Sequence, residues 1–235
     1  MNHVLANPGG AEISNNKRKY SEVYSNILLS GLLLGFFGVS GALLVSTTEL
    51  QTREIIAYNA RMSLLNQLHE LVPESEVDND FVDHPLKLDA PDSFGESDTL
   101  AYIGVRQGKL AAIVFDTIIP NGYAGPIQML VAVDSKGTLM GVRVVSHNET
   151  PGLGDKIELK RSDWVLSFNG KSLTYPNESQ WKVQKDGGVF DQFTGATITP
   201  RTIVNKVRKV LLFVEREQQL LFDRYVKETR GNTSH

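Results

Sequence analysis

Two glycine-rich loops with polar side chains are well suited to holding a ligand. Residues 121–127 read NGYAGPI and residues 147–156 read HNETPGLGDK. Each follows an apolar, β-branched run with the pattern of a strand, so both are expected to lie at strand ends. Glycine lets a flat or anionic ligand approach the backbone, and His147, Glu149 and Thr150 supply acceptors and donors. The same glycines are also ordinary turn residues, so the pattern alone leaves both interpretations open.

A third stretch, residues 186–200, reads DGGVFDQFTGATITP and leads into a long amphipathic pattern. Thr199 is expected to cap the helix and Pro200 to occupy its first position. The free amides of that first turn would point towards Thr197, and a helix N-terminus preceded by glycine is a common phosphate site. Threonines before a helix also serve capping alone, and no P-loop pattern is present. The spacing is therefore compatible with phosphate binding without deciding it.

The composition and motifs of the chain rule out several other functions and argue against others. The chain of 235 residues has no cysteine, which removes disulfides, thiolate catalysis and cysteine-ligated iron–sulfur clusters. Its five histidines are scattered, so no metal site is expected. No G-x-S-x-G hydrolase elbow occurs. Lys plus Arg total 24 against 27 Asp plus Glu, a formal net charge of -3, which argues against nucleic acid as the main partner. Redox chemistry would need an organic cofactor.

The apolar periodicity predicts the elements that would position these loops. Runs over residues 99–106 and 109–119, and over 127–133 and 138–146, are separated by turn residues, which predicts two antiparallel hairpins. From residue 200 to about 227 apolar positions recur with helical spacing, which predicts a long amphipathic C-terminal helix. The expected fold class is therefore α+β.

One segment near the N-terminus is long and apolar enough to span a membrane. No charged residue occurs from Ile27 to Val45, and at about 1.5 Å per helical residue that run spans roughly the 30 Å hydrocarbon core. A cleaved signal peptide is the alternative, but the run is longer than usual and no clear cleavage site follows. A Lys-Arg-Lys cluster precedes the run, so we expect a single-pass inner-membrane protein with a cytoplasmic N-terminus and its main domain in the periplasm.

The segment after the anchor completes the expected organisation. Residues 49–72 carry a ragged helical period that Pro73 ends, and the residues from there to Asp98 are rich in acids and proline, which is typical of an irregular connection. The expected parts are a cytoplasmic arm at 1–26, a transmembrane helix at 27–45, a helical stalk and acidic connection at 46–98, a ligand-binding domain at 99–227 and a polar tail at 228–235.

The loop motifs together resemble a known flavoprotein family. Residues 191–197, DQFTGAT, are similar to the D-x-x-[ST]-G-A-T signature at which a flavin transferase couples FMN to threonine through a phosphoester bond. Residues 147–154 are similar to that family's H-x-E-T-P-G-L-G loop, and residues 122–127 to its G-Y-x-G-x-I segment. With the anchor, the resemblance covers Ile27 to about Leu212. It points to the G subunits of bacterial Rnf (Rsx) ion-translocating electron transport complexes, which are membrane-anchored flavoproteins facing the periplasm.

The resemblance implies FMN as the cofactor, bound covalently to Thr197 by a flavin transferase. The transferase's recognition motif would be completed by Asp191, Thr194, Gly195 and Ala196. The other implied cofactor-binding residues are Tyr123, His147, Glu149, Thr150, Gly152, Leu153, Lys156 and Thr199, of which Thr150, Leu153 and Lys156 would line the isoalloxazine ring. The cationic Lys182, Lys185 and Arg201 either assist the phosphate or are solvated charges.

The family resemblance predicts an electron-transfer protein of a larger complex rather than a stand-alone enzyme. That complex would couple electron transfer between ferredoxin-type donors and NAD to translocation of Na+ or H+, and its other subunits and the membrane would be the partners. Two alternatives stay open. One is the C subunit of the sodium-pumping NADH:quinone reductase, which shares the flavin motif. The other is a non-redox, membrane-tethered binding module whose glycine loops are only turns.

Overall fold

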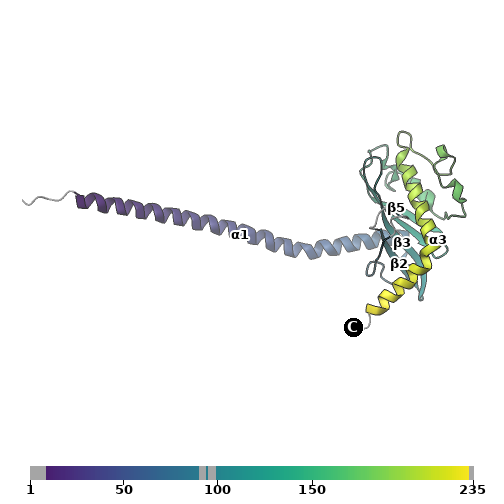
Figure 1. Ribbon diagram of the computed structural model, residues 1–235, viewed down its shortest axis with the longest axis horizontal. Coiled ribbons are helices and arrows are strands. Elements are labelled where there is room, and N and C mark those ends of the chain that lie inside the picture. The colour runs from purple at the N-terminus through teal and green to yellow at the C-terminus, as the bar shows by residue number, and fades with distance from the viewer. Residues whose placement is uncertain (1–8, 90–93, 95–98, 233–235) are drawn as a thin grey trace, which may run out of the picture. The chain divides into compact units, whose positions relative to one another are not determined.

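The computed structural model describes residues 9–89, 94 and 99–232 (Figure 1). The chain forms two units, Met1–Ala60 and Arg61–His235. Helix α1 (Gly9–Leu71) is 63 residues long, and within it Ile27–Thr47 has a mean hydropathy of 2.2 with none of its window buried. Within the described ranges this is the one helix long and apolar enough to cross a membrane. The apolar helix expected at residues 27–45 is therefore present.

The second unit is built on a five-stranded antiparallel sheet with the strand order β1-β2-β3-β4-β5. Both expected hairpins, β2–β3 and β4–β5, are confirmed, and β3 and β4 pair to join them. The strands are β1 (Leu86–Leu88), β2 (Thr99–Arg106), β3 (Lys109–Ile119), β4 (Ile127–Asp134) and β5 (Leu139–Ser146).

Local turn chemistry sets both hairpins. Gln107 and Gly108 have φ values of 51° and 72°, and two-residue hairpin turns of type I′ require positive φ at both central positions. In the second hairpin the Asp134 carboxylate accepts hydrogen bonds from the backbone N–H groups of Lys136 and Thr138, each at 2.8 Å. The turns depend on residues that are close together in the sequence, so the strand boundaries could be predicted from the sequence.

Helix α3 (Ile198–Asn232, 35 residues) covers one face of the sheet (Figure 1). Alternate residues of β3 point towards it, and Phe115 packs edge-to-face with Phe213 of α3 at a centroid distance of 6.1 Å. Phe94, from the segment between β1 and β2, adds a second ring 4.8 Å from Phe213. This contiguous apolar core fixes the position of α3, and therefore of the residues at its N-terminus.

The opposite face of the sheet is covered by the C-terminal end of α1. Leu68 and Leu71 join Phe81 and the sheet residue Val114 in a separate buried cluster. Gly104 of β2 is glycine for a steric reason, because a Cβ there would lie 2.7 Å from the Phe81 ring. Residues from Arg61 onwards, expected as stalk and acidic connection, thus belong to the compact unit.

Three local expectations need correction. The acidic connection is not wholly irregular, because it contains β1, which pairs with β2; most of its residues between Ala90 and Asp98 lie outside the described ones. The C-terminal helix continues to Asn232 instead of ending near residue 227, so most of the expected polar tail is helical. The helix also begins at Ile198, two positions before Pro200.

Leu68→Ala tests whether the end of α1 is part of the folded unit. Leu68 is 0% exposed, so we expect the free energy of unfolding to fall by about 2–5 kcal/mol, the usual cost of a buried leucine cavity. The measurement is urea unfolding of the detergent-solubilised chain followed by tryptophan fluorescence, because both tryptophans, Trp164 and Trp181, lie in this unit. The matched control is Leu220→Ala, at a leucine that is 65% exposed on α3, where a change within about 0.5 kcal/mol is expected. Equal effects would contradict this assignment of the core.

Candidate functional site

The loops selected from the sequence meet at one buried carboxylate, that of Glu149. This residue is 4% exposed. Its Oε1 accepts a hydrogen bond from the backbone N–H of Ala124 at 3.1 Å. Its Oε2 accepts one from the hydroxyl of Thr199 in the first turn of α3, at 2.6 Å. A single side chain therefore joins the loop after β3, the loop after β5 and the N-terminus of α3.

Glycines on two sides make room for this carboxylate. A Cβ on Gly122 would lie 2.9 Å from Glu149 Oε1 and 2.3 Å from the carbonyl oxygen of Gly125. A Cβ on Gly154 would lie 2.7 Å from Glu149 Oε2. All three distances are too short for real contacts, so these glycines serve close packing around Glu149 and not only turn formation.

His147 supports the same loop from its other end. Its Nδ1 accepts a hydrogen bond from the backbone N–H of Glu149 at 2.9 Å. Its Nε2 lies 2.7 Å from Glu158 Oε1. Because Nδ1 accepts, the neutral ring carries its proton on Nε2 and donates to Glu158. His147 therefore holds the loop after β5 in place. Its partner Glu158 was not predicted from the sequence.

The turn at residues 191–197 is held by contacts that lie far apart in the sequence. The indole Nε1 of Trp164 donates to the carbonyl oxygen of Asp191 at 2.9 Å, and Gln184 Nε2 donates to its carboxylate at 2.5 Å. Phe193 is buried with its ring 5.2 Å from that of Trp164. The Ala196 N–H donates to the Phe193 carbonyl at 3.2 Å, which closes the turn. The motif is therefore a defined, folded turn.

Gly195 brings this turn against the loop that follows β5. It has a φ of +83°, a conformation that favours glycine. A Cβ on Gly195 would lie 3.2 Å from Leu153 Cδ2, so the two segments are in close contact. Gly152, with a φ of +78°, lies in the tight turn closed by the Leu153 and Gly154 N–H groups donating to the Thr150 carbonyl. Gly195 is thus in contact with Leu153, and Gly152 lies in the turn next to Leu153.

The three threonines near the start of α3 have different environments. Thr197 immediately precedes the helix and is half-buried, whereas Thr194 is exposed in the turn. Thr199 was expected to cap the helix, which is wrong: it lies inside the first turn, is 0% exposed and donates its hydroxyl to Glu149. The capping pattern was misleading because the acceptor for Thr199 is 50 positions away in sequence.

Apolar side chains remain exposed on the three segments that Glu149 joins. Tyr123 is 66% exposed, and Leu153 and Ile198 are each 43% exposed. They come from the loop after β3, the loop after β5 and the start of α3, which are the three segments joined by Glu149. Thr150 and Lys156 are also exposed. A partly apolar surface beside a helix N-terminus can hold a flat aromatic group that carries an anion.

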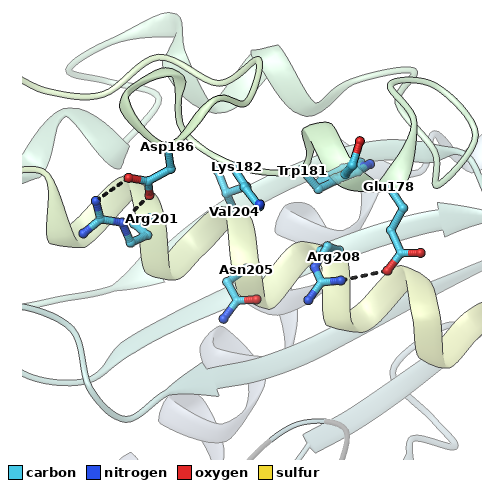
Figure 2. Close-up of a pocket in the computed structure, with 9 residues that line it drawn as sticks. Glu178, Trp181, Lys182, Asp186, Arg201, Val204, Asn205 and Arg208 are labelled. Atoms are coloured by element: carbon cyan, nitrogen blue, oxygen red, sulfur yellow. Dashed lines mark hydrogen bonds and ion pairs between the residues drawn. The ribbon is translucent and has the colours of Figure 1, made fainter.

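Two arginines that line a groove beside α3, Arg201 and Arg208, are held in ion pairs. The groove has a volume of about 600 Å³, and Figure 2 shows Arg201 facing Asp186 in it. Arg201 donates twice to that carboxylate, at 2.6 and 2.9 Å, and this pairing lowers the pKa of Asp186 and raises that of Arg201. Arg208 pairs with Glu178 at 2.8 Å in the same groove. The ion pair of Arg201 with Asp186 therefore attaches α3 to the segment that precedes the turn at residues 191–197.

Gly154→Ala tests the packing around Glu149. The new methyl group would displace the carboxylate and weaken its bond to Thr199, so we expect the free energy of unfolding to fall by about 1–3 kcal/mol. The matched control is Gly231→Ala, where a Cβ has nothing within 4 Å and stability should stay the same or rise by up to about 1 kcal/mol. Thermal unfolding of the parent and of both variants measures these changes in stability. A Gly154→Ala protein as stable as the parent would refute the close packing.

Two family models match this chain. The model of the FMN-binding domain family matches residues 122–212, a range that includes all three segments. The model of the RnfG N-terminal region matches residues 20–71, which cover the apolar span and the end of α1.

Relatives align over most of the chain, and each is the G subunit of an ion-translocating oxidoreductase complex. That of Shewanella loihica is 42% identical over 200 residues, covering 85% of this chain and 94% of the relative. That of Vibrio cholerae is 45% identical over 193 residues, covering 82% and 92%. That of Vibrio vulnificus is 43% identical over 194 residues, covering 81% and 92%. The chain therefore belongs to the family of G subunits of ion-translocating oxidoreductase complexes.

Proposed function

We propose that this protein is a membrane-anchored flavoprotein that carries electrons within an ion-translocating oxidoreductase complex, with FMN bound covalently to Thr197. The observation that carries the proposal is the folded turn at residues 191–197, which ends in a threonine directly before α3 and lies inside the range matched by the FMN-binding domain. FMN supplies the redox chemistry, and the protein supplies its binding and orientation.

Environment favours Thr197 over the neighbouring threonines as the attachment point. The hydroxyl of Thr199 is buried and donates to Glu149, so it is not accessible to a modifying enzyme. Thr194 is exposed but lies in the turn itself, away from the helix end. A phosphoester at Thr197 would keep one negative charge beside the first-turn amides of Ile198 and Thr199, which have no partner within the helix, and helix N-termini stabilise such anions.

The surroundings of Thr197 fit the rest of the cofactor. The exposed apolar side chains of Tyr123, Leu153 and Ile198 offer a surface for an aromatic ring system. Maturation by a flavin transferase fits a motif whose residues Asp191, Thr194 and Gly195 are exposed. A covalent link also keeps the flavin at high local concentration where a lost cofactor could not be recaptured readily.

The names of the relatives favour one type of complex over the other. Each of the compared relatives is named as a G subunit, which favours an Rnf-type complex over the C subunit of the sodium-pumping NADH:quinone reductase. The FMN-binding match disfavours a non-redox binding module. In such a complex the protein would pass electrons on a path between ferredoxin-type donors and NAD, coupled to movement of Na+ or H+, with the other subunits as partners.

We also propose that the N-terminus is cytoplasmic and the compact unit periplasmic. The Lys-Arg-Lys cluster at residues 17–19 precedes the span, and short basic segments tend to stay on the cytoplasmic side. The absence of cysteine from the sequence suits an oxidising compartment. The domain that would bind FMN then lies outside the cytoplasmic membrane.

Thr197→Val tests the attachment site. Coexpression with a flavin transferase should give the parent protein a fluorescent band on a denaturing gel, and the variant should lose it because valine has no hydroxyl to form the phosphoester. Thr194→Ser is the matched control, since it changes a threonine of the same turn but preserves the motif, and should keep full fluorescence. Fluorescence that survives in Thr197→Val would move the attachment elsewhere; a dark parent would favour a binding module without flavin.

A reporter enzyme that is active only outside the cytoplasm tests the orientation. Fused after His235 it should be active, because a single span places the C-terminus opposite the N-terminus. The same reporter fused ahead of Met1 of the full-length chain should be made but inactive. The reverse pattern of activities would invert the proposed topology.

A further inference from the structure

The environment of Glu149 differs from that of a residue that binds a cofactor directly. It is almost completely buried, and both of its carboxylate oxygens already accept hydrogen bonds, from Ala124 and Thr199. Two accepted bonds are the pattern of an ionised carboxylate. The side chain is therefore occupied by the protein itself, and any influence on a cofactor must pass through its partners or through its charge.

The partner Thr199 links Glu149 to the proposed attachment site. Thr199 follows Thr197 by two positions, and the segment between them is the first turn of α3. Thr202 strengthens this turn by donating its hydroxyl to the Thr199 carbonyl at 2.9 Å. Gly122 and Gly154 enclose the carboxylate so closely that it cannot shift without moving the loops. The hydrogen bond from Thr199 to Glu149 therefore ties the first turn of α3, and Thr197 just before it, to the loop after β5.

We propose that Glu149 is a positioning residue for the flavin, which fixes Thr197 through Thr199 and whose buried charge makes the attached flavin harder to reduce. This inference rests on the proposed covalent FMN at Thr197. A buried negative charge close to a redox group opposes the arrival of an electron, because the low dielectric of the interior weakens screening. Removing that charge should therefore shift the midpoint potential of the flavin to a more positive value.

Two substitutions separate the positioning role from the charge. Glu149→Gln removes the charge but keeps the shape, and its amide can donate to the Thr199 hydroxyl while its oxygen still accepts from Ala124. Thr199→Val keeps the charge but removes the hydroxyl donor at nearly constant volume. Thr199→Ser restores a donor and is the conservative rescue. All three are made in the full-length chain, solubilised in detergent.

Two measurements are compared on each protein. Hydrogen exchange of the peptide covering residues 191–199, in flavin-loaded and flavin-free protein, reports positioning. We expect about five- to tenfold faster exchange in Thr199→Val, because that factor corresponds to the loss of an ordinary hydrogen bond. We expect exchange rates close to those of the parent in Glu149→Gln and Thr199→Ser. The midpoint potential of the loaded protein reports the charge, and should be clearly more positive in Glu149→Gln than in the parent and in Thr199→Ser.

The outcomes that overturn the proposal are distinct from failure of the covalent attachment. Parent-like exchange in Thr199→Val would overturn the positioning role, and an unchanged potential in Glu149→Gln would overturn the effect of the charge. Flavin content on a denaturing gel is measured separately. A parent chain without covalent flavin would refute the proposed function and, with it, the effect on potential, while exchange in the flavin-free proteins would still decide whether Glu149 fixes Thr197.

Discussion

The buried hydrogen bond between Glu149 and Thr199 is the contact on which the arrangement of the site depends. It connects a loop that follows the sheet to the helix that covers the sheet, and the second oxygen of the same carboxylate binds a third segment through Ala124. Burying a carboxylate is costly unless its oxygens find donors. The segments that supply those donors are therefore held together, and the threonine before the helix is held with them.

Helix α3 serves the core and the site at once. Its apolar face packs on the sheet through residues such as Val207 and Phe213, so its axis is fixed by the same burial that stabilises the fold. Its N-terminus is consequently held at a set place on the surface, joined through Glu149 to the loops that carry the exposed Leu153 and Tyr123. A rigid helix end with free amides offers an anion a preorganised site without a dedicated cationic pocket, which agrees with the pairing of Arg201 to Asp186.

The sequence was sufficient where local chemistry decides the structure. Both hairpins follow from turn residues between β-branched runs, and α3 follows from its apolar period. Strand β1 was missed because it has only three residues, Leu86 to Leu88, and is defined by pairing with β2. The true partner of Thr199 was missed for a similar reason, since a distant carboxylate outweighed its capping tendency. The roles of Trp164 and Gln184 in holding the turn at Asp191 likewise depend on tertiary contacts that no local pattern encodes.

Mass spectrometry of the protein purified from its native host is the most direct test of the proposed attachment of FMN to the hydroxyl of Thr197. Fragmentation of the peptide that spans residues 191–201 should place the mass of FMN less one water, as in a phosphoester, on Thr197 and leave Thr194 and Thr199 unmodified. An unmodified Thr197 in a complex that still transfers electrons at its full rate would contradict the account.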